Sequence, residues 1–377
     1  MTLEPQTQNS LLDSFNETRN TTLQLVKNLE RDDFGVQTAV FMSPPKWHLG
    51  HVSWLNEIVL SKTQEDYEFY SNELSEYLNS YYNQFGKPHD KSKRGILSRP
   101  TVDEILVYFD KITDRVRQVI KNPLDDNSLY LFTMAIHHEC QHQELLVYDL
   151  QHLLGEQYRP AKRNQPQISS KVEKKEINVK GGLYKMGYSG KDYCYDIELP
   201  EHKTYLSDFQ IDNLLVSNEE YLQFIDEGGY EDYSFWLSDG WDAVQKNEWI
   251  APMYWEKEDG EWITKDFAGK RKISPQEPVC HVSFYEAAAY CKWADKRLPT
   301  EAEWEKAALW NNEKEIKTEF PWGNEKPTYE HGNLLESNIW NCNEVGCYEK
   351  GKSSYGCYQM IGDVWEWTSS EFVGYPG

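Results

Sequence analysis

Two histidines four residues apart, His138 and His142, are the feature of this sequence that most directly indicates chemistry. Apolar residues around them recur at steps of three and four, which predicts one long helix that begins after Asp125-Asp126-Asn127 and stops at Gly155. Residues at positions i and i+4 share a helix face, so both imidazoles can face one ion. A third histidine, His51, lies in a separate helical stretch. Three neutral histidines from two helices would hold a divalent metal and leave coordination positions open for substrate.

The same spacing also matches other patterns. His138, Glu139 and His142 spell the His-Glu-x-x-His motif of zinc proteases, in which the glutamate is a general base. An extended motif of that kind requires a glycine and another histidine soon afterwards, and Gln143–Asp149 provides neither. A single histidine on an apolar face is often a hydrogen-bonded core residue, but two on one stripe are costly to bury without a shared purpose. The all-imidazole set favours Fe(II), which can bind a thiolate and O₂ together.

The remaining histidines of this region are weaker candidates. His48 and His137 lie off the apolar stripe or beside better candidates, and we expect His152 to be structural. The stripe itself also carries Asp149.

Helices must position these side chains, and the first part of the chain predicts five of them. Their approximate ranges are 11–29, 45–61, 65–85, 101–122 and 128–154. Residues 1–155 therefore predict a helical bundle of the four-helix type, with a metal in its core. Residues 156–177 are polar and basic and predict a linker. Residues 178–377 change to short strands, many turns and few helices, which predicts an α+β domain with irregular loops.

Composition excludes several classes of function. The 377 residues favour about two domains, and the net charge of −23 argues against nucleic acid or an anionic membrane as partner. No apolar run approaches the roughly 20 residues of a membrane span, and the N-terminus has no signal-peptide pattern. Seven scattered cysteines are typical of reduced thiols. We therefore expect a cytoplasmic protein.

Longer motifs identify a family resemblance. Trp47-x-Leu-x-His51, together with His138-Glu-x-x-His142-x-Glu144, resembles the DinB-type iron domain of the sulfoxide synthases of ergothioneine biosynthesis. The second half resembles the formylglycine-generating-enzyme or sulfatase-modifying-factor domain, whose fold is C-type-lectin-like. The matching stretches are Gly182–Gly187, Pro278–Ser283, Lys296–Glu305, Phe320–Asn324 and Met360–Thr368. The resemblance covers nearly the whole chain, and the pairing of these two domains is itself typical of the synthases.

The resemblance implies a reaction and a set of site residues. These non-haem iron enzymes use Fe(II) and O₂ to join γ-glutamylcysteine or cysteine to C2 of the imidazole of hercynine (Nα-trimethylhistidine) and oxidise the sulfur to a sulfoxide. It also implies that His51, His138 and His142 are the iron ligands and that Gln141 lies near hercynine.

Two further groups of residues are assigned in the same way. Lys91 and Arg94 align with a basic pair that holds the carboxylates of the thiol substrate, although arginine is common where this chain has Lys91. A tyrosine is expected as proton donor, with Tyr375 as the first candidate and Tyr82 and Tyr81 next.

Family members continue beyond the position of Gly377, so we expect a C-terminally incomplete second domain, with a separate C-terminal fragment as a conceivable partner. Two other functions fit the same motifs. One is a DinB-type metal-dependent thiol transferase without redox chemistry. The other is an inactive or split-enzyme fragment that acts as a binding module.

Overall fold

The computed structural model describes residues 8–80, 89–159, 164–167, 172–190 and 193–376. The chain divides into two compact units, a helical unit formed by residues 2–161 and an α+β unit formed by residues 162–377. No helix within the described ranges combines the length and the apolar character needed to cross a lipid bilayer.

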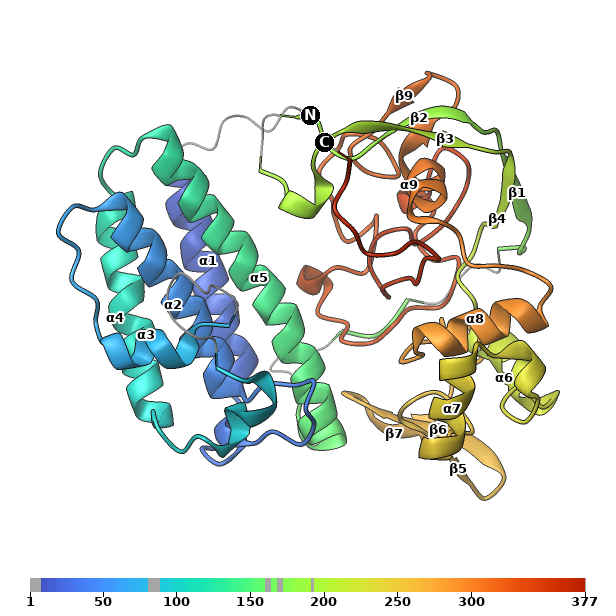
Figure 1. The fold of residues 1–377 in the computed structure, drawn as a ribbon, viewed down its shortest axis with the longest axis horizontal. Helices are drawn as coiled ribbons and strands as arrows, with labels where there is room; N and C mark the ends of the chain where they lie inside the picture. Colours follow the sequence, from blue (N-terminus) through green and yellow to red (C-terminus); the bar gives the residue numbers. More distant parts are fainter. Residues whose placement is uncertain (1–7, 81–88, 160–163, 168–171, 191–192, 377) are drawn as a thin grey trace. The chain divides into compact units, whose positions relative to one another are not determined.

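The helical unit is a bundle in which α1, α2, α4 and α5 lie side by side (Figure 1). Its core contains bulky side chains that are almost fully buried, among them Trp54, Tyr108, Phe109 and Phe132. Its helices are α1 (Gln8–Val26), α2 (Pro45–Thr63), α3 (Asn72–Leu78), α4 (Val102–Ile120), α5 (Asp126–Leu154) and the 3₁₀ helices η1 (Asp33–Gly35), η3 (Lys91–Ile96) and η4 (Gly155–Gln157).

Local signals explain where the long helices begin and end. Thr101 and Glu104 form the capping box that starts α4. The Asp125 side chain accepts a hydrogen bond from the Ser128 amide at the start of α5, and Gly155 follows the end of α5 with a φ of 50°. The predicted positions of these two helices are therefore confirmed.

The third predicted helix is wrong in extent. The sequence predicts a helix over 65–85, of which residues 81–85 lie outside the described ranges, and within residues 65–80 α3 covers only Asn72–Leu78. Ser71 caps α3 by accepting a hydrogen bond from a backbone amide of its first turn. The preceding residues are held in an irregular conformation, because the buried carboxylate of Glu57 accepts the Tyr70 amide at 2.6 Å. A tertiary contact thus overrides the local helical periodicity.

The α+β unit consists of short antiparallel strand pairs, helices of nine or ten residues and long loops (Figure 1), which confirms the predicted fold class. β1 pairs with β4, β2 with β3 and β8 with β9, and β5, β6 and β7 form a three-stranded sheet. The strands are β1 (Glu176–Val179), β2 (Gly182–Met186), β3 (His202–Leu206), β4 (Phe209–Asp212), β5 (Trp255–Glu258), β6 (Glu261–Asp266), β7 (Gly269–Lys272), β8 (Trp310–Asn311) and β9 (Ile316–Lys317). The helices are α6 (Asn218–Asp226), α7 (Ser238–Asn247), α8 (Phe284–Trp293), α9 (Glu301–Leu309) and the 3₁₀ helices η5 (Asp196–Glu198), η6 (Tyr233–Phe235), η7 (Leu335–Ser337) and η8 (Glu349–Gly351).

Helices α6, α8 and α9 each begin at a capping box, started by Ser217, Ser283 and Thr300. The first two helices pack through an aromatic cluster that includes Tyr221, Phe224 and Tyr290.

Candidate metal centre

Three imidazole rings converge in the core of the helical unit. His51 comes from α2, and His138 and His142 come from α5, which packs directly against α2. The ring centroids of His138 and His142 are 4.5 Å apart, and those of His51 and His142 are 4.7 Å apart. One nitrogen of each ring lies within 4.8 Å of a nitrogen of the other two. The structure therefore brings together the three residues that the sequence singles out as ligands.

The hydrogen bond of His51 determines which of its nitrogens can bind a metal. Its Nδ1 lies 2.6 Å from the carbonyl oxygen of Leu78. A carbonyl only accepts hydrogen bonds, so Nδ1 carries the proton and Nε2 keeps its lone pair. This pattern, a ligand histidine that donates its other N–H to a backbone carbonyl, is common at metal sites.

His138 provides a test of whether a metal fits. Its Nδ1 is buried and has no hydrogen-bond partner among the described residues. Buried polar atoms are nearly always paired, so an orphaned ring nitrogen beside two other imidazoles needs an explanation. Metal coordination by this ring would explain the missing hydrogen-bond partner, because the lone pair of a neutral imidazole is a metal ligand. The donor set fits a divalent transition metal.

Burial keeps the three rings in their metal-binding form. Loss of solvation lowers the pKa of His138 to about 4. The pKa values of His51 and His142 also lie well below their usual range, first because of burial and then because the histidines repel one another when charged. All three are thus neutral at neutral pH, as metal coordination requires.

The same shift makes the stability of the metal-free protein depend on pH. His138 titrates at about 4 when folded and near 6.5 when unfolded, so the unfolded chain binds more protons between these values. The stabilisation is fully present above 6.5 and is lost as the pH falls toward 4. For one such histidine we expect a loss of up to about 3 kcal/mol in the free energy of unfolding. Urea unfolding of the metal-free protein at neutral pH and at about pH 5 measures the first part of this loss, about 2 kcal/mol. A His138→Gln variant, which cannot titrate there, should lose less.

The glutamate of the His-Glu-x-x-His motif serves a different purpose. Glu139 is buried, and its carboxylate accepts hydrogen bonds from Arg19 at 2.9 Å and Thr22 at 2.6 Å, both on α1. Both oxygens are therefore used within the bundle core, and Glu139 is not available as a general base. The protease pattern is coincidental.

The predicted basic pair lies close to the histidines. The Arg94 guanidinium is buried and stands 3.4 Å over the ring of Trp47, which in turn stacks on His51 with centroids 4.4 Å apart. Lys91 is exposed. Burial lowers the pKa of His48, and the positive charges of Arg94 and Lys91 contribute to this shift, so both cations are within electrostatic range of the cluster.

The other predicted site residues are placed as follows. Gln141 is an exposed residue of α5, directly before His142. Tyr375 belongs to the α+β unit, where its hydroxyl donates to Glu301 at 2.7 Å and its ring lies 4.6 Å from that of His202. Tyr81 and Tyr82 lie outside the described residues. Their roles stay predictions.

Three residues beside the cluster were not predicted as site residues. His48 contacts His142, Asp149 binds His48, and Ser43 binds Asp149. A signal for one of them existed, because Asp149 follows His142 by seven residues on the same predicted stripe.

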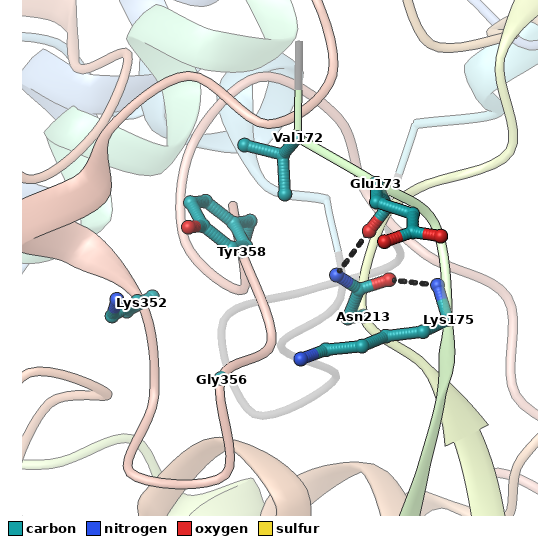
Figure 2. A pocket seen from close by; sticks show the side chains of 7 residues that line it. All are labelled: Val172, Glu173, Lys175, Asn213, Lys352, Gly356 and Tyr358. Atoms are coloured by element: carbon teal, nitrogen blue, oxygen red, sulfur yellow. Dashed lines mark hydrogen bonds between the residues drawn. The ribbon is translucent and has the colours of Figure 1, made fainter. Parts of the chain in front are cut away.

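The α+β unit has a small pocket whose lining contains no histidine (Figure 2). Its volume is about 190 Å³, and none of the predicted site residues lines it. Within it, the Asn213 side chain accepts the Lys175 amide and donates to the Glu173 carbonyl, so its polar groups anchor the backbone before β1. The lining residues are Val172, Glu173, Lys175, Asn213, Lys352, Gly356 and Tyr358.

Comparisons with known proteins agree with the two units. Residues 14–146 match the DinB superfamily, and residues 161–376 match the sulfatase-modifying factor enzyme 1-like domain. The hercynine oxygenase of Mycolicibacterium smegmatis is 32% identical over 372 residues, which is 98% of this chain and 84% of the relative. That of Mycobacterium tuberculosis is 32% identical over 94% of this chain and 82% of its own length. The formylglycine-generating enzyme of Thermomonospora curvata is 32% identical over 54% of this chain and 73% of its own. The chain therefore belongs to the hercynine oxygenase family of oxidoreductases.

Proposed function

We propose that this protein joins hercynine to a cysteine-containing thiol, γ-glutamylcysteine or cysteine, and oxidises the new thioether to a sulfoxide in ergothioneine biosynthesis. The observation that carries the proposal is the set of three neutral, convergent imidazoles in a chain that is 32% identical to a hercynine oxygenase over 98% of its length. The reaction consumes small molecules only, and we place it in the cytoplasm.

The atoms and electrons of this reaction balance without an outside reductant. A C–H bond at C2 of hercynine and the S–H bond of the thiol are lost, and a C–S bond forms with release of two electrons. Oxidation of sulfur to the sulfoxide releases two more. One O₂ accepts all four, because one oxygen atom enters the product and the other leaves as water.

We assign the metal to the histidine cluster. His51, His138 and His142 would hold Fe(II), which supplies open coordination positions and the capacity to react with O₂. The chain itself would bind and orient the two substrates around that position. Such positioning converts a reaction between separate molecules into one between fixed neighbours.

The remaining assignments rest on the charge, the hydrogen-bonding groups and the protonation state of the side chains. Arg94 and Lys91 provide positive charge for the carboxylates of the thiol substrate, and Gln141 provides an amide beside the hercynine position. Tyr375 would act as the proton donor of the reaction. Burial and the hydrogen bond to Glu301 raise the pKa of Tyr375, so its phenol keeps that proton at neutral pH.

The test is an assay with defined metal and oxygen. Protein loaded anaerobically with Fe(II) is mixed with hercynine and either thiol and then exposed to isotopically heavy O₂. We expect a product with the mass of hercynine plus thiol plus one heavy oxygen atom minus two hydrogen atoms, detected by mass spectrometry. Running both thiols in parallel identifies the preferred donor.

Zn(II)-loaded protein is the control, because Zn(II) binds imidazoles but has no redox chemistry. Thiol transfer to an electrophilic acceptor that proceeds with Zn(II) and without O₂ would instead establish a thiol transferase, because such a transfer needs no oxidant. Absence of any product with Fe(II) and O₂ would contradict the proposal and favour a binding module.

A further inference from the structure

His48 lies between one of the three clustered histidines and a carboxylate. Its Nδ1 is 3.1 Å from Nδ1 of His142, and its Nε2 is 2.8 Å from Oδ2 of Asp149. The His48 side chain is 3% exposed and that of Asp149 is 13% exposed. Because α2 carries His48 and α5 carries the other two, the contact chain crosses the helix interface at the cluster.

The donors and acceptors of this chain can be arranged in one direction when His48 is neutral. The Asp149 carboxylate only accepts hydrogen bonds, so Nε2 of His48 must carry the proton that it receives. A neutral imidazole then has a lone pair on Nδ1, which requires Nδ1 of His142 to be the donor. His142 is thereby held with its proton on Nδ1, and its Nε2 keeps the lone pair.

A second set of contacts fixes the carboxylate. The Ser43 amide donates to Oδ2 of Asp149 at 2.9 Å, and the Ser43 hydroxyl accepts a hydrogen bond from Nη1 of Arg94 at 2.8 Å. Ser43 is buried, as is Arg94. Asp149 is therefore anchored to the segment that leads into α2, and it cannot rotate away from His48 without loss of a buried hydrogen bond.

A purely structural tie between α2 and α5 would need only the pair of His48 and Asp149. The additional contact between two Nδ1 atoms is favourable only if one ring donates and the other accepts, and Asp149 determines which ring does so. A hydrogen-bond acceptor also determines the tautomer of His51, because the Leu78 carbonyl holds its proton on Nδ1. Two of the three rings thus present Nε2 for the same reason.

We propose that His48 and Asp149 are positioning residues that hold His142 in its Nδ1–H form and in a fixed orientation, with Nε2 directed to the metal. The inference rests on the proposed function only in that the three histidines bind a metal. Groups in this position typically change metal affinity about 10–100-fold when they are removed.

Three variants separate this role from packing. His48→Phe keeps the ring volume but removes both nitrogens, and Asp149→Ala removes the carboxylate. His48→Gln keeps an acceptor for His142 and a donor for Asp149. It should therefore preserve the hydrogen-bonded chain from Asp149 through residue 48 to His142, which we call the relay. His152→Phe is the matched control, because it introduces the same ring at a histidine of α5 outside the contact chain.

The measurement is a Co(II) titration of the full chain, followed by the ligand-field absorption of the bound ion. We expect His48→Phe and Asp149→Ala to bind Co(II) about 10–100-fold more weakly than wild type. His48→Gln and His152→Phe should stay within about threefold, since they leave the relay or its equivalent in place. Nitrogen NMR of the metal-free, histidine-labelled protein should show His142 as the Nδ1–H tautomer in wild type, and this signal should change in His48→Phe.

Several outcomes would overturn the relay. Co(II) affinity of His48→Phe equal to that of wild type would do so, as would His48→Gln binding as weakly as His48→Phe. A wild-type protein that binds no Co(II) would overturn both the relay and the metal site. Tight Co(II) binding that His48→Phe weakens, combined with no sulfoxide from the iron-loaded protein, would support the relay and overturn only the proposed function.

Discussion

Replacement of His142 with alanine is expected to abolish sulfoxide formation and to lower the affinity for Fe(II) by more than about 100-fold. The bound is conservative, because loss of a group that only supports a ligand already costs about 10–100-fold. His142 has two roles at the cluster. Its ring centroid lies within 4.7 Å of those of both His51 and His138, and its Nδ1 also contacts Nδ1 of His48. Its removal therefore eliminates a ligand and the end point of the relay.

Anaerobic Fe(II) titration and the sulfoxide assay measure the two effects separately. His152→Ala, ten residues further along α5, is the control for loss of an imidazole from the same helix. We expect that variant to retain iron and activity. If His142→Ala formed product within about tenfold of the wild-type rate, that loss of about 1.4 kcal/mol would be too small for a metal ligand, and the assignment of the cluster would be wrong.

The parts of this site that the sequence could predict are those that depend on local spacing. His138 and His142 share a face because any α-helix places i and i+4 together, and Asp125 and Gly155 mark the ends of that helix through capping interactions. The convergence of His51 with them required more than periodicity. The position of His51 in a helical stretch of its own made it a candidate, and the family resemblance assigned it as a ligand. The packing of α2 against α5 brings it beside His138 and His142.

The parts that spacing could not predict depend on contacts between helices. His48 seemed a poor ligand because it lies beside better candidates, yet its ring faces both His142 and Asp149. Nothing in the periodicity of α2 indicates which carboxylate of α5 it meets. The direction of a proton along such a contact chain is a tertiary property, because it requires both ends to be known.

Two residues assigned from the family resemblance are engaged in other contacts. Arg94 lies close to the cluster, as its stacking on Trp47 shows, but its guanidinium is buried and already bonded to Ser43. Tyr375 belongs to the other unit, with its hydroxyl on Glu301. Its role as proton donor therefore depends on a change of hydrogen-bond partner, and it stays a proposal.

Removal of the Glu139 carboxylate should be the most damaging substitution for stability in the helical unit. Arg19 and Glu139 form an ion pair whose side chains are each 1% exposed. The guanidinium donates three more hydrogen bonds, to Thr113, Ser53 and the Phe109 carbonyl. Burial lowers the pKa of Arg19, and the charge and hydrogen bond of Glu139 oppose that shift. Glu139→Ala leaves that cation unpaired, and we expect the free energy of unfolding to fall by about 3–5 kcal/mol.

Urea unfolding of the metal-free protein measures this loss, with Glu144→Ala as the control because Glu144 is exposed on the same helix. That control should change stability by no more than about 0.5 kcal/mol. A double variant, Arg19→Met with Glu139→Leu, should recover much of the loss, because apolar side chains can replace a buried ion pair.

The same variants separate the two meanings of the His-Glu-x-x-His motif. If Glu139 were a general base, Glu139→Ala would fold with nearly wild-type stability and lose its chemistry. If it is the partner of Arg19, the folded fraction of Glu139→Ala should keep its Fe(II) affinity while its unfolding midpoint drops. The second result is expected because both carboxylate oxygens are bound by α1, whereas His138 and His142 retain their own contacts within the cluster.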